Sequence, residues 1–193
     1  MCIRDSGAFV NGGIGDPASI ATTPVGDGGV PIISGSCFLH RQADDFAASW
    51  PAGTDIGESG DVFVFRMPPR NADAEPTALA GGGFVVAFSD RREVQALQAY
   101  LSTPDWAGAM ADETGGRWVS PNSGQDPATV VDPVSRVALG VLQDPRMIIR
   151  YDGSDRMPAV VGSTALPQAM TAWVTGTPTA GALAAVEASW PRQ

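Results

Sequence analysis

Residues 80–90 have the sequence AGGGFVVAFSD, in which three glycines precede an apolar run and a helix-capping pair follows it. The apolar run 84–88 is rich in β-branched and aromatic residues, which predicts a strand. Ser89 and Asp90 are preferred N-cap residues, and apolar side chains recur at helical spacing over 91–101. A strand that feeds directly into a helix indicates an α/β fold built of packed layers.

The flanking sequence predicts further strands and helices in a mixed order. The clearest strand is expected over 61–67, where Pro68 and Pro69 end it. A strand is also predicted over 30–33, and 147–151 is either a strand or the end of a helix. Asp-Pro and Thr-Pro pairs at helix starts, together with apolar periodicity, predict the remaining helices over 16–22, 37–50, 103–113, 132–142, 165–175 and 178–189.

Composition excludes several classes of function. The 193 residues carry twelve basic and twenty-one acidic side chains, a net charge of −9, and no basic stripe, which argues against a nucleic-acid partner. No apolar run approaches the ~20 residues of a membrane span. One histidine and two cysteines supply neither a zinc set nor a disulfide framework. The first six residues lack the pattern of a signal peptide, and we interpret 1–6 as an adapter artefact.

Three local patterns are compatible with catalysis or nucleotide binding, but each has a simpler structural interpretation. Residues 57–60, GESG, are one residue short of a nucleophile elbow and favour a surface turn. Cys37 and His40 are only neighbours on one segment, so we expect Cys37 to be buried and structural, or, in a secreted full-length protein, paired with an upstream cysteine that this sequence does not include. The loose G-x-G-x-x-A pattern over 13–18 is explained by a helix cap.

Two polar or glycine-rich segments are candidates for ligand contact. The triplet Gly81, Gly82 and Gly83 permits unusual backbone angles and close approach of a partner, and its alternative interpretation is a flexible turn. The loop 152–155, DGSD, groups oxygen ligands but lacks the length and closing glutamate of a calcium loop. It suits either acceptance of hydrogen bonds from a ligand hydroxyl or capping of the next segment.

The order of these motifs resembles the C-terminal half of family 1 extracellular solute-binding proteins, especially the alpha-glucoside type. The resemblance extends from about residue 8 to the end and implies that the chain is a C-terminal fragment of such a protein. It is carried by eight segments in order: 37–42, 61–69, 81–83, 88–101, 120–122, 151–158, 173–176 and 187–191.

The resemblance implies an α/β, periplasmic-binding-protein type II-like (Venus flytrap) fold, here as an incomplete two-lobe fragment. By analogy, 7–68 forms part of the C-terminal lobe and 69–76 is the hinge crossing. Residues 77–128 then form part of the N-terminal lobe, and 129–193 returns to the C-terminal lobe with the terminal helices. Such a fragment would leave strand edges unpaired.

The implied function is that of the substrate-binding component of an ABC importer, which holds a sugar or oligosaccharide between the lobes without chemistry. The implied partners are that sugar and the importer's membrane permease subunits. We expect a monomer without a cofactor or metal, periplasmic or extracellular, and lipid-anchored in the full-length protein. The expected ligand-binding residues are Gly81, Gly82, Gly83, Asp152, Ser154, Asp155 and Thr164.

Two departures from the family bear on this site. Phe84 stands where the family often has an acidic residue after the glycines, and Ala165-Leu166-Pro167 stands where it usually offers aromatic side chains for sugar stacking. Two other classes of function remain open: a glycan-active hydrolase, which would need two carboxylates flanking the ligand, and an interaction domain without a small ligand.

Overall fold

The structure is a computed structural model that describes residues 2–3, 17–69, 71 and 73–192. The described residues mix helices with short strands, as the sequence predicts. Strand β3 (Thr77–Ala80) pairs in parallel with β4 (Ile148–Tyr151), and Ala80 lies opposite Tyr151. Strand β1 (Cys2–Ile3) pairs antiparallel with β2 (Leu39–His40).

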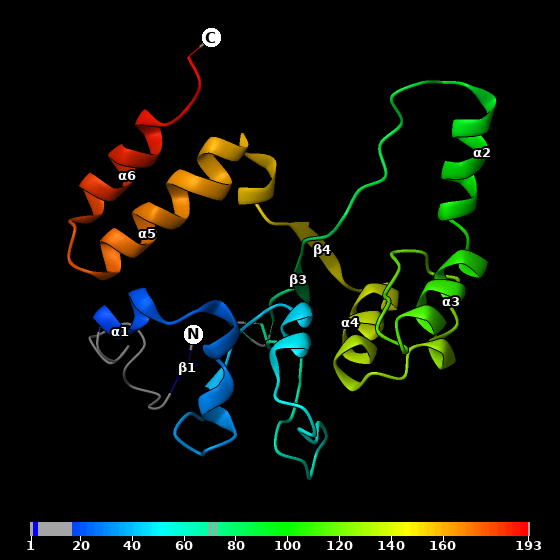
Figure 1. Cartoon of the computed structure of the whole chain (residues 1–193), viewed down its shortest axis with the longest axis horizontal. Coiled ribbons are helices and arrows are strands. Elements are labelled where there is room, and N and C mark those ends of the chain that lie inside the picture. Colours follow the sequence, from blue (N-terminus) through cyan, green and yellow to red (C-terminus); the bar gives the residue numbers. More distant parts are fainter. Residues whose placement is uncertain (1, 4–16, 70, 72, 193) are drawn as a thin grey trace.

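Two groups of helices lie on either side of the β3–β4 pair (Figure 1). One group lies where the chain runs from β3 towards β4, and the other follows β4. The first contains α2 (Arg92–Leu101), α3 (Pro104–Glu113) and α4 (Pro133–Gln143); the second contains α5 (Leu166–Val174) and α6 (Thr179–Ala188), with α1 (Pro17–Thr22) nearby.

The predicted caps position α3 and α4. The Thr103 hydroxyl accepts a hydrogen bond from the backbone N–H of Trp106 at 3.2 Å. The Asp132 carboxylate accepts from the backbone N–H of Ser135 at 2.8 Å. In both helices a proline occupies the first turn, where its missing N–H costs no intrahelical bond.

Residues 103–143, which we term the α3–α4 unit, contain the best-packed core. Ala107, Ala111 and Val130 are 0% exposed, and Leu139 is 1% exposed. The Trp106 and Trp118 rings meet edge to face with centroids 5.2 Å apart. These contacts join α3, the loop after it and α4 into one small hydrophobic core.

A buried polar network joins the loop of the α3–α4 unit to its helices. The Gln125 side chain is 1% exposed; its oxygen accepts from Ser120 N–H at 2.8 Å and its nitrogen donates to Trp118 C=O at 3.0 Å. Gln143 on α4 donates to the backbone oxygen of Gln125 at 2.8 Å. Burial of these groups is tolerated because each is hydrogen-bonded.

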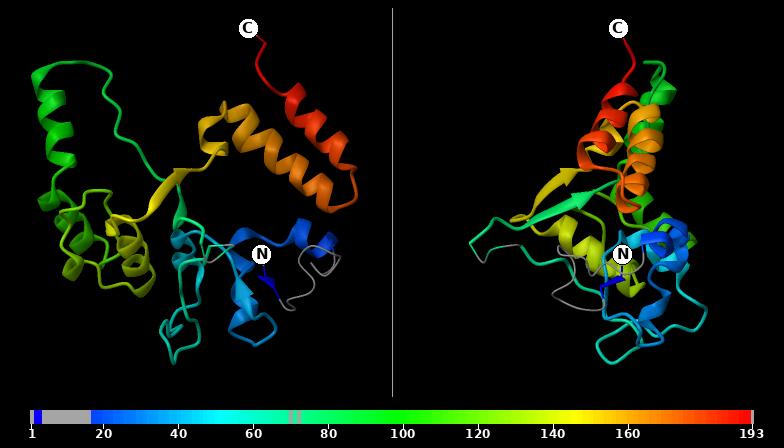
Figure 2. Two further views of the ribbon diagram at one scale, coloured as in Figure 1. Left: turned by 180° about the vertical axis from the view of Figure 1, so that it is seen from behind. Right: turned by 90° about the vertical axis from the view of Figure 1, so that its left-hand side faces the viewer.

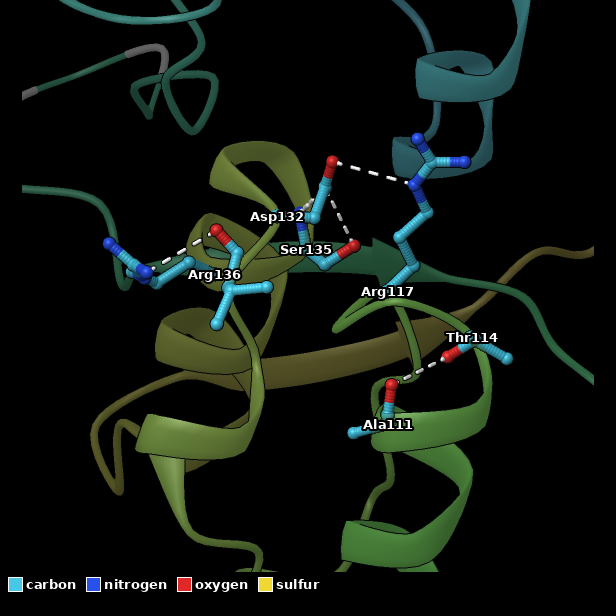
Figure 3. A network of polar contacts seen from close by, with 7 residues as sticks. Ala111, Thr114, Arg117, Asp132, Ser135 and Arg136 are labelled. Atoms are coloured by element: carbon cyan, nitrogen blue, oxygen red, sulfur yellow. Dashed lines mark hydrogen bonds and ion pairs between the residues drawn. The ribbon is translucent and has the colours of Figure 1, made fainter.

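A glycine turn ends α3 and brings the chain beside α4 (Figure 3). Gly116 has φ +76°, and a Cβ at this position would overlap Val131. Its carbonyl accepts a hydrogen bond from Asp132 N–H at 3.2 Å, and Arg117 lies 3.8 Å from the Asp132 carboxylate. Glycine is required here for both its backbone conformation and its lack of a side chain.

The chain after β4 forms a helical hairpin (Figure 2). A π-helical segment, η6 (Val160–Ala165), leads directly into α5. The Trp173 indole N–H donates to the Thr179 hydroxyl at 3.1 Å, which joins the end of α5 to the start of α6.

Four predicted elements differ from the structure. Residues 61–67 are not a strand, and only Val62 makes an isolated bridge, with Ile56. Residues 84–88 belong to no sheet of the described chain. Residues 30–32 form a 3₁₀ turn that contains Pro31, where a strand was predicted. Residues 37–50 contain β2 and the 3₁₀ helix η3 (Asp44–Ser49), where an α-helix was predicted.

Two of these differences, at 61–67 and 84–88, share a physical cause. A strand needs a neighbouring strand for its backbone hydrogen bonds, and 61–67 and 84–88 have none in the described chain. Their aromatic side chains are accordingly exposed, from 51% at Phe65 to 97% at Phe88. The total accessible surface is 13531 Å², whereas a compact monomer of this length exposes about 8,700 Å².

Candidate functional site

The carboxyl ends of β3 and β4 lie side by side because the strands are parallel and in register. Ala80 pairs with Tyr151, and the backbone N–H of Asp152 donates to the Ala80 carbonyl at 3.1 Å. The glycine triplet and the loop 152–155 therefore leave the sheet at the same edge. In open α/β sheets, this edge is where ligands bind.

Gly81 lies against the acidic loop. A Cβ at Gly81 would meet the Asp155 carboxylate oxygen at 3.2 Å, whereas nothing lies within 4 Å of such an atom at Gly82 or Gly83. None of the three is among the described glycines with positive φ. The positive φ that glycine permits is therefore not used at these positions, and the close approach of a ligand to the triplet stays a prediction.

Asp152 organises its own loop. Its Oδ1 accepts from the Ser154 hydroxyl at 2.7 Å and from the Ser154 backbone N–H at 2.8 Å. These hydrogen bonds from Ser154, with a smaller contribution from the charge of Arg41, hold the pKa of Asp152 below its usual value. Asp152 thus caps η5 (Ser154–Arg156), while the exposed carboxylate of Asp155 faces Gly81 and remains open to a ligand.

An aromatic pair that sequence reasoning missed borders the same edge. The Phe84 and Tyr151 rings stack with centroids 5.3 Å apart and an interplanar angle of 30°. Phe84 is 70% exposed and Tyr151 is 42% exposed. In the sequence, Tyr151 directly precedes the acidic loop and Phe84 directly follows the glycines, but the contact between the rings depends on the register of β3 and β4.

Thr164 lies apart from this cluster. It is exposed on η6, and no hydrogen bond joins it to the cluster among the described residues. The segment itself is close, because Gly162 of η6 lies so near the Ser154 carbonyl that a side chain there would collide with it. The structure therefore groups Gly81, Asp152, Ser154 and Asp155, leaves Gly82 and Gly83 open, and places Thr164 at the margin.

The catalytic alternatives from the sequence gain little support. Cys37 is 3% exposed and disulfide-bonded, so it offers no thiolate, and its predicted burial is confirmed. The His40 ring packs against Phe46 with centroids 4.8 Å apart. Residues 57–60 form a turn in which Gly60 N–H donates to Gly57 C=O at 3.2 Å. The dinucleotide-like pattern begins at residues that lie outside the described part of the chain.

The described residues show no other well-formed site. They contain no group of three or more His, Cys, Asp or Glu side chains that could hold a metal ion. No helix among them is long and apolar enough to cross a membrane. A shallow, mainly apolar hollow lies away from β3 and β4, lined by Asp27, Val30, Pro31, Ile33, Ser34 and Pro51.

The edge therefore groups hydrogen-bond acceptors beside an exposed aromatic surface, whereas the shallow hollow among the described residues lies elsewhere. Comparisons with known proteins also indicate a solute-binding protein. The chain is 31% identical over 180 residues to the osmoprotective compounds-binding protein GgtB of Synechocystis sp.. This alignment covers 92% of this chain and 41% of the relative. It is 28% identical over 198 residues to the alpha-glucosides-binding periplasmic protein AglE of Rhizobium meliloti, covering 95% of this chain and 39% of the relative.

The resemblance stated from the motifs is thereby confirmed: the chain is homologous, over almost its whole length, to solute-binding proteins of this kind. It spans about two fifths of the length of these curated relatives. No family model matches the chain. No solved structure matches it either.

Proposed function

We propose that this chain forms part of the substrate-binding component of an ABC importer, and that it holds an uncharged sugar or similar polyol without altering it. The observation that carries the proposal is the meeting of Gly81 and the 152–155 loop at the carboxyl ends of two parallel strands. Homology to binding proteins for alpha-glucosides and for osmoprotective compounds supports the same class of ligand.

Binding without chemistry fits the arrangement of the carboxylates. Hydrolysis of a glycosidic bond uses two carboxyl groups on opposite sides of the bond, about 5–10 Å apart. Asp152 and Asp155 belong to one loop, and Asp152 is already engaged by Ser154. A carboxylate that only accepts hydrogen bonds from ligand hydroxyls needs no such partner.

In the longer protein, we propose a two-lobed, type II periplasmic-binding fold. Residues 69–76 would form a hinge crossing before β3, and β4 would form a return crossing. Figure 1 supports this assignment, since β3 and β4 run between the two groups of helices. The resemblance implied 7–68 and 129–193 in one lobe and 77–128 in the other. Because α4 packs with α3 and comes before β4, we propose that the second lobe extends from 77 to 147 and that 7–68 and 152–193 contribute to the first, with ligand binding favouring the closed arrangement.

The proposed partners are those of a substrate-binding component of an ABC importer. The closed, ligand-bound protein would act as a monomer outside the cytoplasmic membrane and dock on the permease subunits of the importer. The name of one relative states a periplasmic location. Anchoring by a lipid stays a prediction for the full-length protein.

Isothermal titration calorimetry tests the ligand class. The full-length gene product that carries this sequence would be titrated with trehalose, sucrose, maltose, glucose and glycerol, and the mixtures would then be analysed for products by NMR. We expect micromolar binding of at least one saccharide with no turnover. Release of free monosaccharide from a disaccharide would favour the hydrolase, and absence of binding across the panel would refute the proposal.

Two matched substitutions test the location of the site. Asp155→Ala removes an exposed acceptor and should weaken saccharide binding by roughly 10-fold or more, the effect of losing a hydrogen bond to a charged group. Asp112→Ala removes an exposed carboxylate on α3 and should leave the affinity unchanged. Equal affinities of both variants and the wild type would place the ligand elsewhere.

A further inference from the structure

Arg66 lies just before the proposed hinge crossing 69–76 and has a partly buried guanidinium group. The residue is half-buried, and its Nη1 atom is buried without a hydrogen-bond partner among the described residues. Arg66 also belongs to neither of the ion pairs in the described part of the chain. A guanidinium that is shielded from water and lacks an acceptor is costly, so this position calls for an explanation.

The C-terminal end of α4 comes close to the crossing that follows Arg66. Helix α4 packs against η3, which precedes Arg66 in the chain, and its C-cap is Asp144. A few residues further on, the backbone N–H of Ile148 donates to the Pro76 carbonyl at 2.9 Å. The segments that follow Arg66 and Asp144 therefore meet at the start of the β3–β4 pair.

Asp144 already has a partner in its own segment. Its carboxylate accepts hydrogen bonds from Arg146 Nε at 3.0 Å and Arg146 Nη2 at 2.9 Å. The hydrogen bonds and charge of Arg146 lower the pKa of Asp144 to about 2, and the charge of Arg66 contributes to the same shift. Two arginines thus act on one carboxylate, and only Arg146 is bonded to it.

We propose that Arg66 is a positioning residue for ligand binding: when the lobes close, it takes the Asp144 carboxylate from Arg146, and the new ion pair favours the closed arrangement. This inference rests on the two-lobed arrangement proposed above, in which Arg66 belongs to one lobe and Asp144 to the other. Arg66 would set the affinity for the ligand without touching it, through the balance between the open and closed arrangements.

The exchange is favourable because the two arginines differ in their contact with water. The Arg146 side chain is 82% exposed, so water replaces the carboxylate when Arg146 gives it up, and little is lost. The Nη1 atom of Arg66 is buried, so it gains an acceptor that solvent does not supply.

The need of Arg66 for a partner depends on how far the lobes have closed. An open arrangement lets water reach the guanidinium from between the lobes, whereas closure excludes that water and leaves a charge that requires a carboxylate. Arg66 and Asp144 are each only a few residues from a crossing, so a small hinge rotation is sufficient to change their separation. The ion pair is therefore assigned to the closed arrangement.

Opposite changes of affinity at Arg66 and Arg146 test the proposal in the full-length protein. Isothermal titration calorimetry would use the tightest-binding saccharide among trehalose, sucrose, maltose and glucose. Arg66→Met should weaken binding by roughly tenfold, and Arg66→Lys should restore most of the loss. Arg146→Ala should strengthen binding by about threefold, because Asp144 is then free to pair with Arg66. A gain in affinity cannot result from a variant that fails to fold.

A double substitution separates this role from a merely structural one. Asp144→Asn should weaken binding about as much as Arg66→Met, and the two together should weaken it no further. Independent structural effects would multiply, which would overturn the proposal. Arg92→Met, which removes an exposed arginine at the first residue of α2, should leave the affinity unchanged.

The distance between the lobes tests the same role without a saccharide. Spin labels at Glu113→Cys and Glu187→Cys, two exposed positions assigned to different lobes, would report the populations by electron-electron double resonance. Arg146→Ala should increase the population with the shorter distance, and Arg66→Met should decrease it.

The two measurements distinguish failure of this inference from failure of the proposed function. Saccharide binding that Arg66→Met leaves unchanged, or distances that neither substitution alters, would refute the role of Arg66 while the proposed function stands. If the unsubstituted protein bound no saccharide, the proposed function would be refuted, and the spin-label distances alone would decide the role of Arg66.

Discussion

The segment 81–90 is at least as rich in apolar residues as the α3–α4 unit, but the two regions differ in burial. In the α3–α4 unit, Val130 is 0% and Leu139 1% exposed, whereas in the segment Phe84 is 70% and Phe88 97% exposed. The unit finds its packing partners within about forty residues of its own sequence. The segment has no neighbouring strand in the described chain. Burial therefore depends on partners nearby in the chain, and hydrophobicity alone does not provide it.

The largest expected effect lies at the turn that joins the two halves of the α3–α4 unit. Gly116→Ala would force a Cβ onto Val131, whose backbone nitrogen would lie 2.7 Å away, at a position with φ +76°. The conformational and steric costs together should reduce the stability of the unit by about 3 kcal/mol or more. Urea unfolding followed by hydrogen exchange of the α4 amides measures this loss.

Gly115 is the matched control for this prediction. It has φ +65°, but nothing lies within 4 Å of its added Cβ. Gly115→Ala should therefore show only the conformational cost of about 1–2 kcal/mol. Equal losses at the two positions would show that the contact with Val131 contributes nothing.

A smaller loss is expected from the buried network. Gln125→Ala would leave the Ser120 N–H and the Trp118 carbonyl without their partner in a buried site. Such unsatisfied groups should reduce stability by about 1–3 kcal/mol, even though no charge is removed. Gln98→Ala on α2, which removes one exposed bond to the Val85 carbonyl, should cost less than about 0.5 kcal/mol in the same unfolding assay.

Most of the helices were predictable because their signals are local, although similar apolar spacing wrongly predicted an α-helix over 37–50. The caps Thr103 and Asp132 and the apolar spacing of α2 mark helices at nearly their observed bounds. The predicted strands 61–67 and 84–88 needed a neighbour that the pattern cannot specify. Only 147–151, one of two open interpretations, became a strand, because β3 lies beside it.

The segment 81–90 should respond to substitution in the opposite way from the α3–α4 unit. Phe88→Ser removes an apolar side chain that is 97% exposed. We expect the stability of this chain to change by less than about 0.5 kcal/mol and its tendency to self-associate to fall, since large exposed apolar groups favour association. Sedimentation velocity at increasing protein concentration measures the change. Unfolding caused by Phe88→Ser would show that this side chain packs in solution.

The candidate site was predictable in its polar part and not in its aromatic part. The glycine triplet and the loop 152–155 are conspicuous in the sequence, and parallel pairing of β3 with β4 brings Gly81 and Asp155 together. The Phe84–Tyr151 stack depends on the register of two strands separated by about seventy residues of chain, which no local pattern encodes. Thr164 was assigned by resemblance alone, and it lies on the margin.

The smallest expected effect concerns two carboxylates, one at the end of the α3–α4 unit and one at the site. Paired hydrogen bonds from Arg146, at 3.0 and 2.9 Å, lower the pKa of Asp144 to about 2. A lowered pKa in the folded state stabilises the fold above the unfolded value, and this contribution is lost as the pH falls through about 2.

NMR titration of the aspartate side chains separates the causes of the two shifts. Arg146→Ala should raise the midpoint of Asp144 towards its ordinary value and leave that of Asp152 low, because Ser154 holds Asp152 independently of Arg146. Ser154→Ala should do the reverse. Since both carboxylates are only half-buried and still in contact with water, neither substitution should change the unfolding midpoint measurably at neutral pH. If Arg146→Ala shifted the midpoints of both Asp144 and Asp152, the α3–α4 unit and the 152–155 loop would be electrostatically coupled. The two regions would then differ in burial but would not be independent in their charges.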